Sequence, residues 1–367
     1  MASVSAYTTS SGRTRYRVRY RLPDGRSTDA RGFLTKQAAV NHAHQVEVDK
    51  GRGKLVSHSA GRTTVGAVAE QWFASKVNLK PSAKDRYRQS LERQVLPRWG
   101  NVPVSKVTTT AVQEWINDLT HAYSPSVVVK ARGALRMILD VAVRDLRITV
   151  NPAVGTTVPR TRSNDHVYLT ASEVFSLSEH AGHGELVVLV LAFTGLRWGE
   201  MAALKERRWD SQRKRLRIVE SVADVNGVLE WGTPKTHQQR SVPAPAWLAE
   251  RIDVAASGLR PDDLLFPSAG GGVMRNQNAR RDWFDKAVRD SAIPRITPHD
   301  LRHTAASLAI SSGANVKAVQ RMLGHKSASM TLDTYAGLFE DDLDDVASRM
   351  PSPPAIADVT ELRTRRG

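Results

Sequence analysis

The sequence contains no cysteine among its 367 residues, so disulfide bonds and thiolate metal sites are excluded. It also lacks a long apolar run. The longest, Leu186 to Phe193, has eight residues, whereas a helix that spans a bilayer needs about 20. The start of the chain, Met1 to Arg15, has no apolar stretch like that of a signal peptide. These absences favour a cytoplasmic protein that is not embedded in a membrane.

Negative charge is scarce relative to positive charge. The 53 Lys and Arg outnumber the 37 Asp and Glu, which gives a net charge of +16. A field of this sign attracts polyanions, and nucleic acid is the commonest such partner. Charge alone leaves two alternatives open, a general association with RNA or the ribosome and, less favoured, binding to a membrane surface.

The first 62 residues carry half of this net charge, with twelve Lys and Arg against four Asp and Glu. Arginine alternates with aromatic and aliphatic residues, and a strand repeats every two residues, so the arginines are predicted to share one face of a sheet. A turn at Pro23-Asp24-Gly25 and a partner strand from Ser27 to Phe33 follow, then a helix from Thr35 to about Lys50. Adjacent like charges repel unless an anion neutralises them, so we expect DNA contact. The arginines are Arg13, Arg15, Arg17, Arg19 and Arg21.

The next stretch, to about residue 150, has helical periodicity throughout. Four amphipathic helices are predicted: one around Val65 to Phe73, one from Ser82 to Val95, one opened by Thr108 and one opened by Ser124-Pro125. Ser and Thr caps and a proline at the first helical position define these starts. The last stretch mixes helix and strand. The chain is therefore expected to be multidomain. We expect a small N-terminal three-stranded sheet plus helix with a linker (1–62), a helical domain (63–159), a mixed, mainly helical domain with a small sheet (160–350) and a tail (351–367).

The mixed domain contains four short motifs. In the first, residues 194–200 (TGLRWGE), an apolar helix is predicted to end at Gly195 and another to begin near Arg197, where backbone N–H groups also favour an anion. In the second, residues 297–303 (TPHDLRH), Thr297 and Asp300 form a predicted capping box at a helix start. His299 and Arg302 are three residues apart and should share a helix face.

The other two motifs lie on turns. Gly324 is predicted to close a helix begun near Asn315, which would leave His325 on an exposed turn ten residues before Tyr335. Lys235, in residues 234–236 (PKT), is expected near a hairpin tip, where a lysine is usually solvated.

Metal sites are the weaker interpretations of two patterns. His299 and His303 have the four-residue spacing of the zinc motif H-E-x-x-H, but Asp300 stands where glutamate is needed and Arg302 would place a cation beside the metal. The acidic run at 340–345 lacks the spacing and glycine of a calcium loop, so a solvated helix start is favoured.

Taken in order, these motifs resemble those of the tyrosine recombinase (phage integrase) family over residues 160–340. The helical stretch before them looks like the core-binding domain of the family, and the N-terminal sheet and helix look like the arm-binding domain of some integrases. The resemblance implies a site-specific DNA recombinase that integrates, and with a partner excises, a mobile element such as a phage genome. It implies that the catalytic residues are Arg197, Lys235, His299, Arg302, His325 and Tyr335.

The chemistry of these residue types suits the transfer of a phosphodiester. Two guanidiniums offer paired donors to the non-bridging oxygens and keep their charge. Tyrosine has a reference pKa of about 10, so it can form a stable phosphotyrosyl link and still leave when a DNA hydroxyl attacks. A lysine can protonate the departing 5′ oxygen, while histidines hold the phosphate or move the proton of the nucleophile. The covalent link conserves the bond energy, so no cofactor is expected. Consistently, no G-x-x-x-x-G-K-[ST] loop is present.

The resemblance also implies partners. Four protomers are expected to act on double-stranded DNA at core and arm-type sites through a Holliday junction, with a host DNA-bending protein and an excision-directionality factor as further partners. Two other functions remain in view. A type IB topoisomerase shares this chemistry but acts as a monomer, and a DNA-binding regulator would carry a vestigial catalytic set. Glu200 is expected either to orient its neighbours or to be structural.

Overall fold

The computed structural model of the chain describes residues 1–22, 25–51, 60–160, 166–234, 239–338 and 350. The chain divides into two compact units, Met1–Ser163 (unit 1) and Asn164–Gly367 (unit 2). Lys235 and the helix start predicted at 340–345 lie outside the described residues, as does the tail 351–367. The predicted turn and linkers lie partly outside them.

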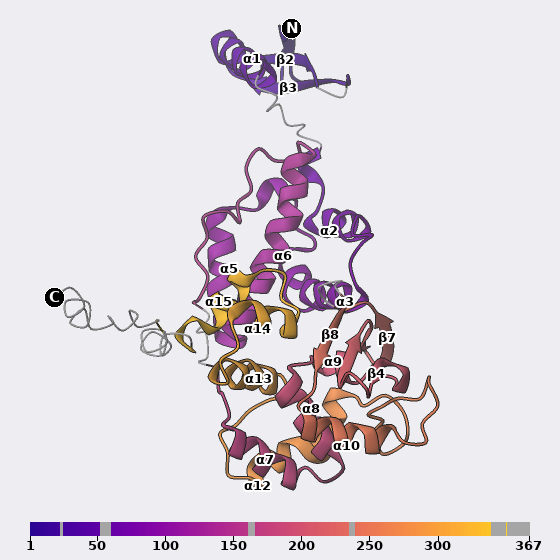
Figure 1. Ribbon diagram of the computed structural model, residues 1–367. Coiled ribbons are helices and arrows are strands. Elements are labelled where there is room, and N and C mark those ends of the chain that lie inside the picture. Colours follow the sequence, from indigo (N-terminus) through magenta and orange to yellow (C-terminus); the bar gives the residue numbers. More distant parts are fainter. Residues whose placement is uncertain (23–24, 52–59, 161–165, 235–238, 339–349, 351–367) are drawn as a thin grey trace, which may run out of the picture. The chain divides into compact units, whose positions relative to one another are not determined.

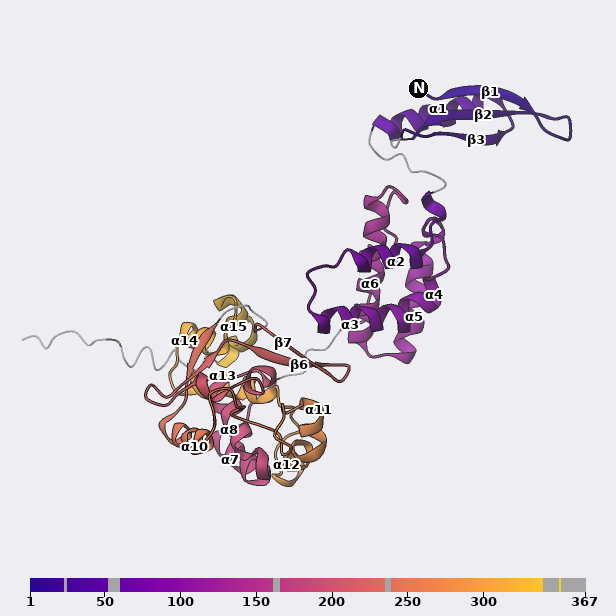
Figure 2. The same ribbon diagram turned by 90° about the vertical axis from the view of Figure 1, so that its right-hand side faces the viewer.

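Unit 1 begins with an antiparallel sheet of order β1-β2-β3, followed by a helix that packs on all three strands (Figures 1 and 2). Their bounds are β1 Ser3–Thr8, β2 Thr14–Arg21, β3 Ser27–Phe33 and α1 Lys36–Gly51. The sheet and helix predicted for this region are confirmed.

The alternation along β2 separates its two faces. Val18 is fully buried, and Leu22 and Tyr20 pack with Val46 of α1. The residues between them are the arginines, which therefore stand on the face away from α1. On that face Arg17 donates to Ser5 Oγ at 3.0 Å. A short core of this kind leaves the opposite, basic face to solvent.

The rest of unit 1 is a helical bundle with its own core. Its helices are α2 Val65–Ala74, α3 Pro81–Ser90, α4 Leu96–Trp99, α5 Thr109–Ala122 and α6 Pro125–Arg144, with short turns η1 Ala60–Arg62 and η3 Val104–Lys106. A π-helical segment, η2 Leu91–Val95, joins α3 to α4, so the second predicted helix runs on to Trp99. Thr108 caps α5 as predicted, by accepting a backbone N–H group, and Thr64 does the same for α2. Proline opens α6 as predicted, but the side chain of Ser124 makes no cap bond there.

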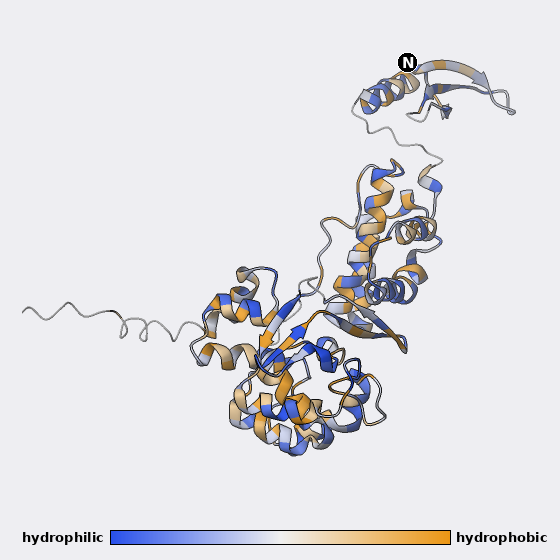
Figure 3. Ribbon diagram, turned by 45° about the vertical axis from the view of Figure 1, so that its right-hand side comes forward, coloured by the Kyte–Doolittle hydropathy of each residue, from blue (hydrophilic) through white to orange (hydrophobic). Residues whose placement is uncertain are grey.

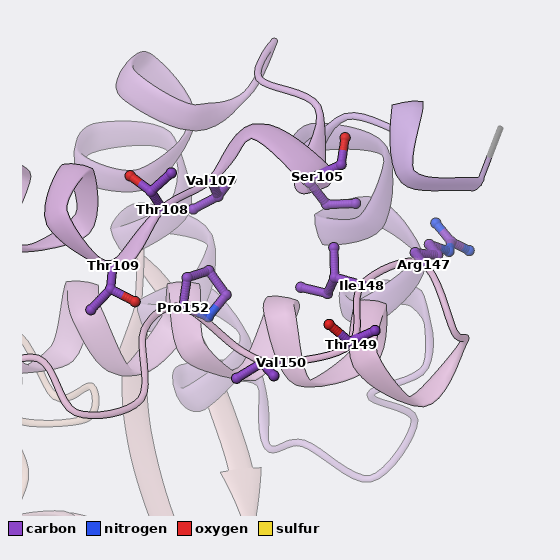
Figure 4. Close-up of a pocket in the computed structure, with 10 residues that line it drawn as sticks. Ser105, Val107, Thr108, Thr109, Arg147, Ile148, Thr149, Val150 and Pro152 are labelled. Carbon is purple, nitrogen blue, oxygen red and sulfur yellow. The ribbon is translucent and has the colours of Figure 1, made fainter. Parts of the chain in front are cut away.

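A pocket of about 390 Å³ lies beside this bundle, between the segments 104–109 and 147–152 (Figure 4). Its walls mix apolar side chains such as Val107 and Ile148 with polar ones such as Ser105 and Arg147. Arg147 is held by Gln71 at 2.7 Å and by Asp145 at 3.0 Å. The predicted catalytic residues that the structure describes do not line this pocket.

Unit 2 is mainly helical with two small sheets, of order β4-β5-β8 and β6-β7. Its strands are β4 Trp209–Asp210, β5 Arg215–Ile218, β6 Ser221–Val225, β7 Val228–Gly232 and β8 Arg240–Pro243. The helices are α7 Ala171–His180, α8 Glu185–Thr194, α9 Trp198–Met201, α10 Ala246–Ala256, α11 Asn276–Ala279, α12 Asp285–Asp290, α13 Asp300–Ser311, α14 Val316–Leu323 and α15 Ala328–Tyr335, with short segments η4 Gly182–Gly184, η5 Glu206–Arg208, η6 Arg280–Phe284 and η7 Ala336–Leu338.

The apolar helix α8 forms the centre of unit 2. Seven of its ten residues are buried, and α7, α10 and α13 pack against it (Figure 1). Figure 3 colours the ribbon by hydropathy, with hydrophobic residues in orange. It cannot be a bilayer span, and the helices that the structure describes include none long and apolar enough to cross a membrane. A helix that is apolar on all sides belongs in a protein core. The ends of α8 and α13 therefore have fixed positions from which functional groups can project.

Candidate active site

The site begins at the end of α8, where the chain turns sharply. Gly195 ends the helix with φ of 66°, in the left-handed region that glycine adopts most easily. A Cβ at this position would lie 2.7 Å from Leu323 Cδ2, so the turn is also closely packed. The next helix, α9, begins directly after Arg197, as predicted, and ends at Met201. This turn fixes where Arg197 enters the site.

The buried carboxylate of Glu200 binds two arginines, Arg197 and Arg240. It is 1% exposed and accepts hydrogen bonds from Arg197, through the backbone N–H at 2.9 Å and Nη1 at 3.0 Å. Arg240, at the start of β8, donates two hydrogen bonds to the same carboxylate, from Nη1 to Oε1 at 2.9 Å and from Nη2 to Oε2 at 2.6 Å. Burial alone would raise the pKa of Glu200, but the bonds and charges of Arg240 and Arg197 outweigh it and lower the pKa to about 2. The carboxylate is therefore charged at neutral pH and orients Arg197.

Arg302, the second of the two arginines predicted to be catalytic, lies near the start of α13 and is 3% exposed. Its Nη1 donates to the Gly195 carbonyl at 2.5 Å and its Nη2 to the Leu323 carbonyl at 2.6 Å. Burial, together with the positive charge of Arg197, lowers the pKa of Arg302 to about 9, which leaves it protonated at neutral pH. Arg302 thereby joins the turn after α8 to the end of α14.

His325 lies just beyond that end. As predicted, Gly324 closes α14 in the left-handed conformation and the helix begins near Asn315, whose side chain caps it. The prediction of an exposed turn is wrong: His325 is 9% exposed, and its Nδ1 lies 3.0 Å from Thr331 Oγ1. Its ring is stacked nearly parallel to that of Tyr335, with centroids 6.4 Å apart. Burial and the charges of Arg302 and Arg197 lower the pKa of His325 to about 4, so it is neutral at pH 7.

Tyr335, the last residue of α15, is 2% exposed. It packs in a small cluster with Ile310, Val319 and Leu323. Its hydroxyl oxygen lies 2.9 Å from Nδ1 of His303. Burial raises the pKa of Tyr335 to about 12, although the charge of Arg302 acts in the opposite direction. The hydroxyl is therefore protonated at neutral pH.

His303 stands between three other rings. Its ring is stacked on that of His166, with centroids 4.0 Å apart, and is edge-on to that of His299, with centroids 5.2 Å apart. His299 directly precedes α13, whose first residue is Asp300. Thr297 and Asp300 still meet, at 2.7 Å. Burial and the neighbouring His166 lower the pKa of His303 to about 4.

The structure thus brings together most of the residues that the motifs singled out. Arg302 joins the turn that precedes Arg197 to the turn that precedes His325, and His325 faces Tyr335. His299 reaches this group through the ring of His303. Lys235 lies outside the described residues.

Sequence reasoning missed Arg240 and assigned no catalytic role to His303. Arg240 is the first residue of β8 and has no motif around it, and its partner Glu200 is 40 residues away, so only the fold reveals the pair. His303 had a signal. It follows His299 by one helical turn, which puts both on the helix face that also carries Arg302.

These motifs can be compared with known proteins. Residues 168–341 match the model of the phage integrase family, and residues 65–157 match that of the phage integrase central domain. The chain belongs to the phage integrase family. Among its relatives is the integrase of Mycobacterium phage D29, 26% identical over 318 residues that cover 83% of this chain and 82% of the phage protein. Another is a XerC-like tyrosine recombinase of Caldanaerobacter subterraneus, 25% identical over 74% of this chain and 78% of that protein.

Solved structures share the fold. The Tn1549 transposon integrase in complex with a circular intermediate DNA aligns with a TM-score of 0.68 and 21% identity, over 78% of this chain and 99% of that one. A lambda integrase tetramer bound to a Holliday junction aligns with a TM-score of 0.61 and 18% identity, over 88% of this chain and 96% of that one. The chain is a site-specific tyrosine recombinase, an enzyme that transfers DNA strands.

Proposed function

We propose that this recombinase cleaves and rejoins DNA through a 3′-phosphotyrosyl bond formed by Tyr335. Arg197 and Arg302 would bind the non-bridging oxygens of the scissile phosphate, where negative charge grows during the attack. His299 and His325 would hold the phosphate or move the proton of the nucleophile. Lys235 would donate a proton to the 5′ oxygen as it leaves.

One observation carries this proposal: Arg302 is buried at the junction of the segments that contain the other residues. It donates to Gly195, two residues before Arg197, and to Leu323, two residues before His325. Its guanidinium donates to two neutral carbonyls, and the nearby carboxylate of Glu200 is already bound by Arg197 and Arg240, so positive charge remains at this junction to attract an anion from outside. A DNA phosphate supplies that anion.

We further propose that the parts of the chain have separate tasks. Residues 63–159 and 160–350 would bind the core site, where strands are exchanged. Residues 1–62 would bind arm-type sites through the basic face of β2, where arginines read guanine edges as well as phosphates. The tail, 351–367, is assigned no task.

Assembly follows from the same activity. Four protomers would exchange strands of two duplexes through a Holliday junction, and the lambda integrase tetramer on such a junction supports this proposal. A host DNA-bending protein would assist, and an excision-directionality factor would allow the element to leave. The bacterial and phage sources of the relatives support action in a bacterial cytoplasm.

The proposal is tested by single-turnover cleavage of a nicked duplex that carries the crossover site. The sequence of this site is found first, by sequencing recombination junctions. Arg302→Lys should slow cleavage on the order of 10²-fold, because a lysine cannot hold the paired geometry. Arg251→Lys, on an exposed pair, is the matched control and should cleave normally. Normal cleavage by Arg302→Lys would contradict the assignment, and the absence of any adduct from the wild type would favour a DNA-binding regulator.

A further inference from the structure

Tyr335 must lose a proton when its oxygen bonds to phosphorus. The hydroxyl is buried, and its pKa is raised to about 12, so ionisation before the attack is rare at neutral pH. A nearby group has to take the proton during the reaction. Arg197 and Arg302 provide the phosphate clamp and Lys235 the acid for the leaving group. His299 and His325 were expected either to hold the phosphate or to move this proton, so the acceptor has to be identified from the contacts of the Tyr335 oxygen.

His303 has the position that such an acceptor needs. Its Nδ1 lies 2.9 Å from the Tyr335 oxygen, within the range for direct proton transfer. His325, by comparison, directs its Nδ1 to Thr331. The Nδ1 of His303 can accept this bond when the ring carries its proton on Nε2.

The surroundings of His303 fix its ring and keep it unprotonated. His166 stacks on one face at 4.0 Å, and His299 meets it edge-on at 5.2 Å. The charged and titratable groups around it are His166, His299, Asp300, Arg302 and Tyr335. Burial and the cationic neighbours outweigh Asp300, so the ring has a free lone pair at neutral pH.

We infer that His303 is a further catalytic residue, the group that accepts the Tyr335 proton. As the tyrosine oxygen forms its bond to phosphorus, the bond from phosphorus to the 5′ oxygen breaks, and that oxygen takes a proton from Lys235. The Tyr335 proton moves to Nδ1 of His303, which becomes an imidazolium. On rejoining, the DNA hydroxyl attacks and gives its proton to Lys235, and His303 returns its proton to the departing tyrosine. The inference rests on the proposed function, because Tyr335 must be the nucleophile.

The test measures the rate of adduct formation by the full-length chain on the nicked duplex between pH 6 and 9.5. His303→Ala should be slower on the order of 10²-fold at pH 7, the scale of general base catalysis. Its rate should rise about tenfold per pH unit, since hydroxide replaces the base, whereas the wild-type rate stays level. Added imidazole should accelerate His303→Ala and leave the wild type unchanged.

A second variant separates chemistry from structure. His303→Asn keeps a hydrogen-bond acceptor near the Nδ1 position but removes the basicity, so it should stay as slow as His303→Ala. His180→Ala, at an exposed histidine on α7, is the matched control and should react normally. A wild-type rate in His303→Ala or His303→Asn would overturn the inference. So would a loss that is equal at every pH and insensitive to imidazole. If the wild type forms no adduct that depends on Tyr335, the proposed function fails instead.

Discussion

At the scale of single residues, the site depends on charges that are buried and paired. Glu200 is 1% exposed, and Arg240, which forks onto it, has a side chain that is 7% exposed. Removing one member of such a pair leaves the other charge without compensation in a poorly solvated place. The free energy of unfolding should therefore respond strongly to this carboxylate.

Glu200→Gln should lower the free energy of unfolding by about 3–5 kcal/mol, the range for a broken buried pair. The measurement is urea denaturation followed by the fluorescence of the tryptophans. The matched control is Glu185→Gln, whose partner Arg251 is as exposed as Glu185 itself, and it should change the free energy by less than about 1 kcal/mol. Equal effects of the two variants would show that Glu200 is not a structural charge.

The histidines of the site make stability depend on pH. The pKa of His325 is about 4 in the folded protein and near 6.5 in the unfolded chain, so the unfolded state binds more protons between these values. Stability should therefore fall as pH drops from about 6.5 to 4. In thermal melts, His325→Gln should show a smaller fall over this window than the wild type. His180→Gln, at an exposed position, should keep the wild-type slope, and a slope unchanged by His325→Gln would contradict the assignment.

At the scale of elements, the turns after α8 and α14 hold the site together. Gly195 supplies the carbonyl that Arg302 binds, and Gly324 sets the direction in which His325 leaves its helix. Both glycines have positive φ, at 66° and 67°. Arg302 and the two turns therefore depend on one another, and a change in either turn should alter the position of the guanidinium.

Gly195→Ala should lower the free energy of unfolding by about 1–3 kcal/mol from backbone strain, and by more because its Cβ would meet Leu323. Gly258→Ala is the control, since Gly258 also has positive φ, at 77°, but nothing lies within 4 Å of the added Cβ. The difference between the two, measured by urea denaturation, isolates the packing contribution. Cleavage should also be slower in Gly195→Ala alone. Identical stability in both variants would contradict the close packing at Gly195.

The sequence predicted these elements well where local chemistry defines them. Thr108 acts through its own hydrogen bond and Gly324 through its backbone conformation, so the helix start and the helix end that they form are readable without the fold. The burial of His325 was not readable. It results from the stacking on Tyr335 and the bond to Thr331, which depend on how α15 packs.

The partners of the site charges were hidden for the same reason. Arg240 reaches Glu200 across 40 residues, and His166 reaches His303 from a segment with no regular structure. Motifs record residues whose spacing is short and fixed. Contacts made by tertiary packing leave no such spacing, so they appear only once the elements are assembled.

At the scale of the whole molecule, the distribution of charge suggests two DNA sites. Residues 1–62 carry a net charge of +8 out of +16, and the basic face of β2 is turned away from α1. An element that contacts only phosphates binds all sequences alike and weakens steeply with salt. A face that reads base edges keeps a preference at moderate salt.

In the full-length chain, replacing Arg15, Arg17 and Arg19 with glutamine should abolish protection of arm-type repeats in footprinting and leave adduct formation on core DNA unchanged. The reason is that only the basic face of β2 is altered. The control for net charge replaces three exposed arginines of unit 2 with glutamine and should keep arm protection; they are Arg207, Arg251 and Arg260. Retained protection in the triple variant, or binding to the arm repeats without sequence preference, would contradict the two-site proposal.

The central claim is that Tyr335 becomes covalently bound to DNA, and one measurement tests it directly. The wild type and Tyr335→Phe are incubated with the nicked duplex, denatured, and digested for mass spectrometry of the peptide–nucleotide adduct. The account predicts a 3′-phosphonucleotide on Tyr335 in the wild type, and in Tyr335→Phe normal DNA binding with no adduct, because only the hydroxyl oxygen is removed. An adduct on another residue, or one that persists in Tyr335→Phe, would contradict it.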